Sequence, residues 1–165
     1  MEYKAFLEHI YQRYSGNVKL GLERMHNILA KMGNPNLTLR GIHVAGTNGK
    51  GSTSAMCEAM AMEYGFTTGL NTSPHLIDYL ERIRVNGKEI TYDELFPLYQ
   101  QLEATFDENE ASFFEITTAL AFSAFAKNEV DTAVFEVGLG GRLDGTNPFN
   151  ADVSVITTIS YDHPK

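Results

Sequence analysis

A glycine-rich stretch with one lysine constrains this chain more than any other part of its sequence. It reads Ile42-His43-Val44-Ala45-Gly46-Thr47-Asn48-Gly49-Lys50-Gly51-Ser52-Thr53, so a short apolar run leads into glycines, a lysine and hydroxyl residues. Residues 54–64, rich in small side chains and methionine, have the composition of a helix. Glycines let backbone N–H groups approach an anion closely, and a helix N-terminus adds the positive end of its dipole. The stretch therefore predicts a phosphate-binding loop between a strand and a helix.

The loop departs from the general nucleotide-binding pattern G-x-x-x-x-G-K-[ST]. Val44 stands where that pattern has its first glycine, and Gly51 stands where it has a serine or threonine. An ordinary glycine-rich turn is the alternative, but a solvated turn has no use for a lysine between two glycines. We expect residues 46–52 to bind nucleotide phosphates, with Lys50 reaching the β- and γ-phosphates and a hydroxyl side chain after it able to ligate Mg²⁺.

Helical spacing and capping patterns predict the helices. Apolar side chains at helical spacing predict the first two, over residues 3–14 and 20–32. Two later helices open with capping boxes, in which a hydroxyl residue is followed three positions later by glutamate. These are Thr91 with Glu94, for a helix over 91–106, and Ser112 with Glu115, for a helix over 112–127.

Apolar or β-branched runs predict strands over 42–45, 67–71, 132–137 and 152–160. Asn86-Gly87 predicts a type I′ turn in a hairpin over residues 82–90. Because a helix connects the first two strands, we expect them to be parallel. The predicted fold class is α/β and P-loop NTPase-like, a mostly parallel sheet flanked by helices in one domain.

Composition bounds the possible functions. The net charge of −8, from 13 basic and 21 acidic residues, argues against the basic face that a nucleic-acid-binding protein needs. No run of about 18 apolar residues predicts a membrane span, and the N-terminus lacks a signal-peptide pattern. A single cysteine, Cys57, excludes an internal disulfide and is typical of a reducing compartment. We therefore expect a cytoplasmic protein, and a monomer.

Polar residues gather where the predicted strands end, which is where open parallel sheets bind ligands. Ser73 follows the second strand, with an ordinary turn start as its alternative. Glu136 lies near the end of an apolar strand, where a buried carboxylate needs a cation and where phosphate-loop enzymes place the acidic residue that faces Mg²⁺. A partly exposed strand-end glutamate is the alternative. His163 follows the last strand, and Asp162 beside it could orient the imidazole.

Four separated motifs resemble the Mur ligase superfamily, and within it the folylpolyglutamate and dihydrofolate synthases. They are Gly46-Thr47-Asn48-Gly49-Lys50-Gly51-Ser52, Thr72-Ser73-Pro74-His75-Leu76, Phe135-Glu136-Val137-Gly138-Leu139-Gly140-Gly141-Arg142-Leu143-Asp144 and Asp162-His163. Their order and spacing fit, so the resemblance covers essentially the whole chain. It implies the central ATPase domain of a Mur ligase, truncated, in which the metal ligands are Ser52, Ser73, Glu136 and His163. Lys50, Glu136 and His163 would be the catalytic residues.

The resemblance also implies where a pterin-containing substrate would bind. Four parts of the chain match segments near the substrate in this family: Lys19-Leu20-Gly21, Arg82, Phe114-Glu115 and Leu143-Asp144. Arg82 would meet a phosphate or a substrate carboxylate, with ordinary hairpin surface as its alternative. Glu115 also has a complete structural explanation as part of a capping box, and the two roles need not exclude each other.

The implied reaction is the ATP-dependent addition of L-glutamate to a folate or dihydropteroate carboxylate. ATP with Mg²⁺ would convert the carboxylate to an acyl phosphate, and the amine of glutamate would displace phosphate. Because family members are much longer, we expect residues 1–165 to be an incomplete N-terminal ATP-binding domain, without the C-terminal glutamate ligase domain and inactive alone. The alternatives are a stand-alone P-loop NTPase or kinase, a non-catalytic nucleotide-binding fragment, and another Mur-type ligase.

Overall fold

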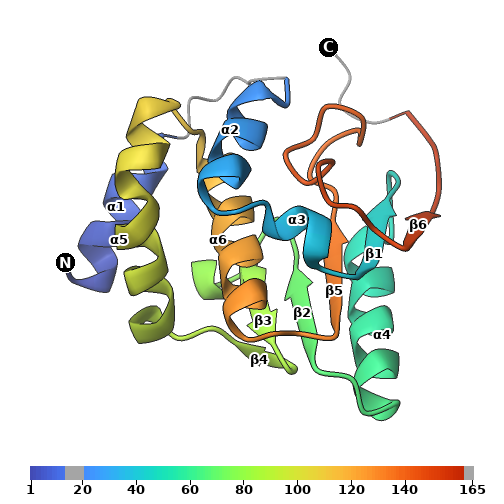
Figure 1. Ribbon diagram of the computed structural model, residues 1–165. Coiled ribbons are helices and arrows are strands. Elements are labelled where there is room, and N and C mark those ends of the chain that lie inside the picture. The colour runs from blue at the N-terminus through green and yellow to red at the C-terminus, as the bar shows by residue number, and fades with distance from the viewer. Residues whose placement is uncertain (14–20, 162–165) are drawn as a thin grey trace.

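The computed structural model describes residues 1–13 and 21–161, which form one sheet with helices on both faces (Figure 1). The helices are α1 (Tyr3–Tyr11), α2 (Glu23–Lys31), α3 (Pro35–Thr38), α4 (Lys50–Glu63), α5 (Tyr92–Glu108) and α6 (Phe113–Lys127). The strands are β1 (Gly41–Ala45), β2 (Thr68–Asn71), β3 (Ile83–Val85), β4 (Lys88–Glu89), β5 (Thr132–Glu136) and β6 (Val153–Ile156). A 3₁₀ helix, η1 (Tyr79–Arg82), leads into β3.

The sheet has the strand order β4-β3-β2-β5-β1-β6. β2, β5, β1 and β6 are parallel, and the antiparallel hairpin of β3 and β4 extends the sheet beside β2. The parallel strands all end at the edge drawn at the top of Figure 1, so the loops that follow them gather there. The predicted α/β fold with a mostly parallel sheet is confirmed.

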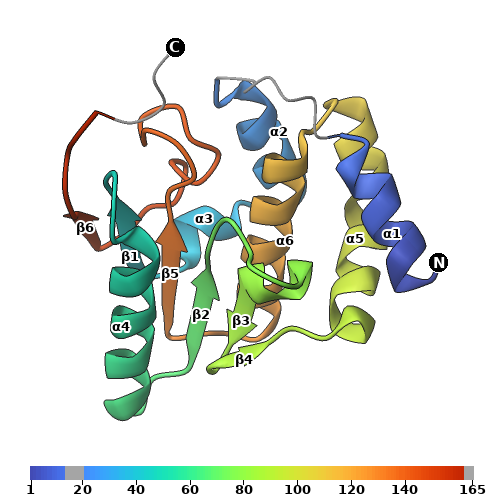
Figure 2. The ribbon, with the colours of Figure 1, turned by 180° about the vertical axis from the view of Figure 1, so that it is seen from behind.

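The two faces of the sheet are covered unequally. α6 lies against one face, with α5, α1 and α2 packed around it, whereas α4 covers the opposite face (Figures 1 and 2). Eleven of the 15 residues of α6 are buried, but only Ser54 and Glu58 are buried among the 14 residues of α4. The Glu58 carboxylate lies 3.4 Å from the Arg84 guanidinium, which joins α4 to β3. The helix that follows the glycine-rich loop is therefore the less deeply packed of the two.

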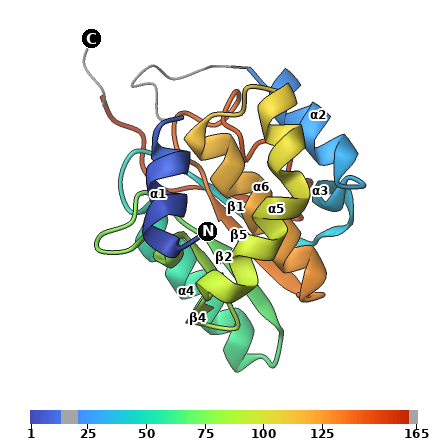
Figure 3. The same cartoon turned by 90° about the vertical axis from the view of Figure 1, so that its left-hand side faces the viewer.

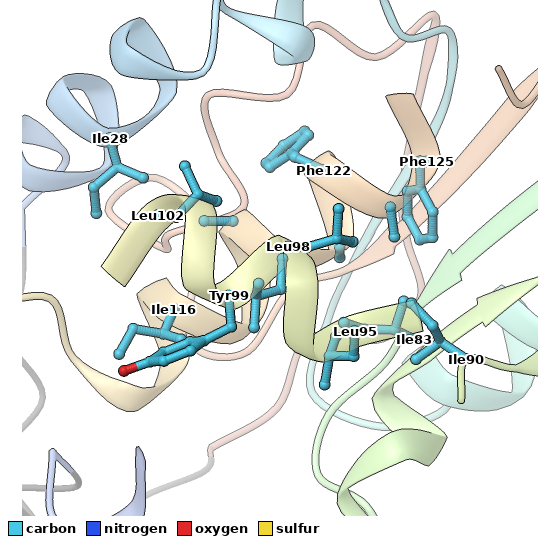
Figure 4. Packing of buried hydrophobic residues seen from close by; sticks show 14 of the residues in the cluster. Ile28, Ile83, Ile90, Leu95, Leu98, Tyr99, Leu102, Ile116, Phe122 and Phe125 are labelled. Atoms are coloured by element: carbon cyan, nitrogen blue, oxygen red, sulfur yellow. The ribbon is translucent and has the colours of Figure 1, made fainter. Parts of the chain in front are cut away.

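The main apolar core lies on the α6 side of the sheet. Figure 3 shows the molecule from the side on which α1 and α5 lie. Figure 4 shows side chains from α2, α5, α6 and β3 meeting between these elements. Phe122 of α6 stacks on Phe135 of β5 with 4.3 Å between ring centroids. On the α4 side, the buried apolar cluster consists of Val44, Leu70 and Val134, and the partly buried Cys57 packs against it. Burial raises the pKa of the Cys57 thiol.

The capping and turn predictions are confirmed. In each predicted capping box, Thr91 with Glu94 and Ser112 with Glu115, both reciprocal hydrogen bonds are present. Asn86 and Gly87 both have positive φ, 49° and 73°, as a type I′ turn requires.

Two boundaries at the carboxyl edge were predicted wrongly. α4 begins at Lys50 rather than at residue 54, because Gly49 turns the chain in the left-handed region, with φ of 82°, directly at the helix N-cap. The last strand ends at Ile156 because its partner β1 ends at Ala45, where the glycine-rich loop begins. Beyond that point, Thr157 and Thr158 donate side-chain hydrogen bonds to the Asn48 carbonyl oxygen of the loop.

Two short helices, α3 and η1, were not predicted. α3 has Pro35 in its first turn, which is a common position for proline at a helix start. η1 opens with a capping box formed by Asp78 and Glu81, and the Asp-x-x-Glu spacing was available in the sequence. Of the helices that the structure describes, none has the length and apolar character needed to cross a bilayer.

Gly69 of β2 lies close against the Phe125 side chain of α6. A Cβ on this residue would approach the ring of Phe125 to 2.5 Å. Because overpacking a core costs about 1–3 kcal/mol, we expect Gly69→Ala to lower the free energy of unfolding by that amount in urea denaturation. Adding Phe125→Leu should recover part of the loss, and strictly additive losses would contradict this contact as the cause.

Candidate nucleotide and metal site

The glycine-rich loop delivers backbone N–H groups to the carboxyl edge of the sheet. It follows β1, and its last residue, Gly49, is the N-cap of α4. Lys50, Gly51 and Ser52 therefore lie in the first helical turn, whose N–H groups have no partner inside the helix. Those N–H groups and the helix dipole favour an anion at this end of α4. Lys50 places a positive charge beside them, and its Nζ donates to the Thr47 carbonyl oxygen at 3.3 Å.

The outer side of the loop is bonded to the segment after β6. The Thr47 N–H donates to the Thr158 carbonyl at 2.7 Å, and the Asn48 N–H donates to the Thr158 hydroxyl at 3.2 Å. The Thr47 hydroxyl also bonds both backbone polar groups of Ser160. These contacts were not predicted, because a Thr-Thr pair after a β-branched run favours a longer strand.

Glu136 is buried at the centre of this edge. It ends β5, is 5% exposed, and lies in register with Val44 of β1. Its Oε2 accepts a hydrogen bond from the Ser73 N–H at 3.0 Å, so the ends of β2 and β5 meet through this carboxylate. A Cβ built on Gly51 would lie 3.6 Å from Glu136 Oε1, which brings the first turn of α4 to the same carboxylate. The alternative of a partly exposed strand-end glutamate is wrong.

Burial makes the charged form of the Glu136 carboxylate less favourable than it is in water. Desolvation raises its pKa, while the hydrogen bond from Ser73 and the charges of Lys50 and Arg82 partly oppose that rise. Among the residues that the structure describes, none forms an ion pair with Glu136. A buried carboxylate without an ion-pair partner is a favourable position for a cation.

The predicted metal ligands are brought together in part. Ser73 and Glu136 are in contact, and Ser52, exposed to solvent, lies next to Gly51 in the first turn of α4. His163 lies outside the described residues. Over residues 1–13 and 21–161, no cluster of three or more His, Cys, Asp or Glu side chains could hold a metal. The predicted set contains only one such residue within those ranges, Glu136.

Arg82 is buried rather than part of an ordinary hairpin surface. It is 8% exposed, its Nε donates to His75 Nδ1 at 2.7 Å, and its guanidinium lies 5.1 Å from the centroid of the Phe113 ring. Burial lowers the pKa of His75, and the charge of Arg82 lowers it further. His75 comes directly after Pro74, so this group lies beside the Ser73 end of β2.

Glu115 joins α6 to α2 as well as capping its own helix. Its carboxylate accepts hydrogen bonds from the Ser112 N–H and hydroxyl, each at 2.8 Å, and from Arg24 Nε at 3.0 Å. Arg24 was not predicted, because it is 91 positions away in the sequence and carries no local signal. Phe114, the neighbouring residue, packs on Gly138, where a Cβ would lie 2.6 Å from its ring.

Asp144 organises the loop after β5. One carboxylate oxygen accepts the N–H groups of Gly138 and Leu139, and the other accepts the N–H and hydroxyl of Thr146. The Thr146 hydroxyl in turn contacts His43 Nε2 of β1 at 2.7 Å. Leu143 is 46% exposed. Asp144 therefore has a structural role, and Leu143 is the accessible member of the predicted pair.

Of the remaining predicted substrate segment, Gly21 lies just before α2, while Lys19 and Leu20 lie outside the described residues. A groove of about 400 Å³ lies away from all these residues, at the opposite edge of the sheet between α4 and β6. Its lining, which includes Cys57, Met60, Phe66 and Val153, is mostly apolar.

Comparison with known proteins gives a consistent result. Residues 44–164 match the Mur ligase middle domain. The dihydrofolate synthase/folylpolyglutamate synthase of Bacillus subtilis (strain 168) is 45% identical over 161 residues, which are 93% of this chain and 37% of that protein.

Solved structures agree over nearly the whole chain. A structure described as E. coli FolC in complex with DHPP and ADP has a TM-score of 0.90 and 37% identity, covering 97% of this chain and 39% of that one. A bifunctional folylpolyglutamate synthase/dihydrofolate synthase, with Mn, AMPPNP and L-glutamate bound, has a TM-score of 0.86 and 36% identity, covering 99% and 39%. The chain thus spans somewhat more than a third of the length of these relatives. It belongs to the Mur ligase family, among whose members it resembles the folylpolyglutamate and dihydrofolate synthases.

Proposed function

We propose that this chain forms the nucleotide- and metal-binding part of an ATP-dependent ligase that adds L-glutamate to a folate or dihydropteroate carboxylate. The observation that carries the proposal is the meeting of the buried Glu136 carboxylate with the first turn of the phosphate-loop helix. A site for anionic phosphates and a site for a cation are thereby adjacent. The relatives' structures with nucleotide, Mn and L-glutamate support this assignment.

The residues present fit Mg²⁺. The space that a side chain on residue 51 would occupy adjoins both oxygens of Glu136, so glycine leaves that space open beside the carboxylate. Hard cations prefer oxygen ligands, and Ser52, Ser73 and Glu136 supply two hydroxyls and a carboxylate at this edge. We propose these three with His163 as the metal ligands. Mg²⁺ bound there would neutralise charge on the phosphates of ATP.

The residues present also fit ATP. The loop and the first turn of α4 direct backbone N–H groups and the Lys50 ammonium toward one side of the carboxyl edge. Lys50 would exchange its hydrogen bond to Thr47 for a phosphate oxygen. In the proposed reaction the substrate carboxylate takes the γ-phosphoryl group of ATP, and the amine of glutamate then displaces phosphate to form an amide.

The proposed substrate contacts come from several segments of the chain. Phe114 and the exposed Leu143 offer apolar surface for a pterin ring, and Asp144 fixes the loop that carries Leu143. Arg82 and Glu115 are each already engaged by neighbours, so we propose that they shape the pocket as well as contact the substrate. Lys19, Leu20 and Gly21 complete the proposed set.

We further propose that residues 1–165 are an incomplete N-terminal ATP-binding domain, and that catalysis also requires a C-terminal glutamate ligase domain. The relatives are more than twice as long as the part matched here, which supports this division. That the protein acts as a monomer in the cytoplasm stays a prediction from its sequence.

Calorimetric titration with Mg·ATP tests the phosphate site. We expect the 165-residue chain to bind and Lys50→Ala to bind about ten- to a hundredfold more weakly, because hydrogen bonds to charged groups contribute about 1.5–3 kcal/mol. Lys88→Ala, which removes the same charge from the exposed strand β4, should bind like the unchanged chain. Equal affinity of all three would contradict the role of Lys50.

The same titration, together with an assay for reaction products, decides between the proposed function and its alternatives. Absence of binding by the unchanged chain would contradict a nucleotide site formed by these residues alone. Phosphorylated product formed without any amino-acid acceptor would favour a stand-alone kinase, and amide formation by this chain would contradict the need for a further domain.

Glu136 gives a prediction about stability. Its pKa is raised in the folded state above the ordinary value of 4.5, so the unfolded chain releases this proton first as pH rises. In the unchanged chain, the free energy of unfolding therefore falls as pH rises from 4.5 to the raised pKa of Glu136. Above that pKa, the contribution of this group stays constant. Gln cannot ionise and still accepts the Ser73 N–H. We expect Glu136→Gln to be more stable in urea at pH 8, with the gain shrinking toward pH 4.5.

Glu63→Gln, at an exposed position of α4, is the matched control and should show no such trend. Mg·ATP should stabilise the unchanged chain and the control but not Glu136→Gln. A pH-independent difference between Glu136→Gln and the unchanged chain would contradict the assigned cause.

A further inference from the structure

The Asn48–Gly49 peptide of the phosphate loop is held from outside by two threonine side chains. The Thr157 hydroxyl donates to the Asn48 carbonyl oxygen at 2.7 Å, and the Thr158 hydroxyl donates to the same oxygen at 3.3 Å. The Asn48 N–H donates to the Thr158 hydroxyl at 3.2 Å. Thr158 therefore bonds both backbone polar groups of Asn48, while Thr157 bonds its carbonyl alone.

These hydrogen bonds fix the direction of the next N–H group. In a planar trans peptide, the carbonyl oxygen of one residue and the N–H of the following residue point in opposite directions. Because the Asn48 oxygen is held toward Thr157 and Thr158, the Gly49 N–H points away from them. Gly49 is the N-cap of α4, so its N–H lies beside the unpaired N–H groups of the first turn.

The orientation matters electrostatically. If the Asn48–Gly49 peptide rotated, its carbonyl oxygen would replace an N–H donor and would repel a phosphate. Gly46 shows how closely the threonine segment approaches the loop, since a Cβ on Gly46 would lie 2.1 Å from the Thr157 hydroxyl oxygen. Thr157 is itself fixed by its N–H, which donates to the Ala45 carbonyl at 2.9 Å.

We propose that Thr157 and Thr158 are positioning residues of the nucleotide site, whose hydroxyls hold the Asn48–Gly49 peptide in the orientation that binds an anion. The predicted effect on nucleotide binding rests on the proposed function. The orientation of the Asn48–Gly49 peptide can be measured without nucleotide. Neither threonine would contact the phosphates. Both act through the loop backbone.

The test compares variants that differ only in the hydroxyls. Thr157→Val/Thr158→Val removes both hydroxyls and keeps the side-chain shape, whereas Thr157→Ser/Thr158→Ser keeps the hydroxyls and removes the methyl groups. We expect the valine pair to bind Mg·ADP about tenfold or more weakly, since hydrogen bonds of this kind contribute about 1 kcal/mol each. The serine pair should bind close to the unchanged chain. Equal binding by the valine pair, or equal losses in both pairs, would overturn the proposal.

A second measurement keeps the inference separate from the proposed function. In ¹⁵N-resolved NMR spectra of the nucleotide-free chain, we expect the valine pair to shift or broaden the amide signals of Asn48 and Gly49, and the serine pair to leave them in place. Unchanged amide signals in the valine pair would overturn the proposed orientation. Absence of nucleotide binding by the unchanged chain, with these amide changes present, would instead count against the proposed function alone.

Discussion

The pairing of β1 with β5 on one side and β6 on the other is the interaction on which the candidate site depends. Parallel strands end at a common edge, so this pairing brings the loop after β1, the Glu136 carboxylate and the threonine segment after β6 to one place. β2 pairs with β5 and adds Ser73. Residues more than a hundred positions apart in the sequence, such as Ile42 and Val153, become neighbours through the backbone hydrogen bonds of the sheet.

The buried Glu136 carboxylate is unfavourable for stability but lies where the proposed cation would bind. An isolated carboxylate in an apolar strand end is unfavourable, and here one backbone N–H and two more distant cations compensate it only in part. Such a group is useful where a cation is meant to bind, because the site is already formed and its ligand is already desolvated. In the same region, the hydrogen bonds from Thr157 and Thr158 to Asn48 orient the N–H group of Gly49 before any ligand binds. The Glu136 carboxylate and the loop N–H groups are therefore both in place before a ligand binds, and binding would require little rearrangement of the chain.

Local signals in the sequence were sufficient for most of the fold. The two capping boxes, the Asn86–Gly87 turn and the apolar runs of the strands depend on near neighbours, and they were found where predicted except for the last strand, which is shorter than predicted. The candidate site was predictable only at residues whose chemistry stands out, such as Lys50 in its glycine loop and Glu136 in its apolar strand.

The remaining contacts depend on residues far apart in the chain. Nothing near Glu115 indicates Arg24, and nothing near Asn48 indicates Thr157 or Thr158. β-branched composition favoured a longer last strand, and the loop contacts overrode that preference. Asp144 shows a further difficulty, since a carboxylate that resembled a substrate contact also has four hydrogen bonds within its own loop region. The sequence alone does not show whether a polar residue in a motif binds a substrate or forms hydrogen bonds within its own loop.

The unequal cover of the two sheet faces has a consequence for motion. α6 is embedded in the main core, whereas α4 is held by the small cluster around Val44, Leu70 and Val134 and by the Glu58–Arg84 pair. Local opening needs less free energy where fewer apolar side chains must be exposed. Amide hydrogens of α4 should therefore exchange with solvent through smaller openings than those of α6. A ligand bound at the start of α4 would slow amide exchange in this helix selectively. Its binding would then be detected as slower exchange along the whole helix rather than only at the first turn.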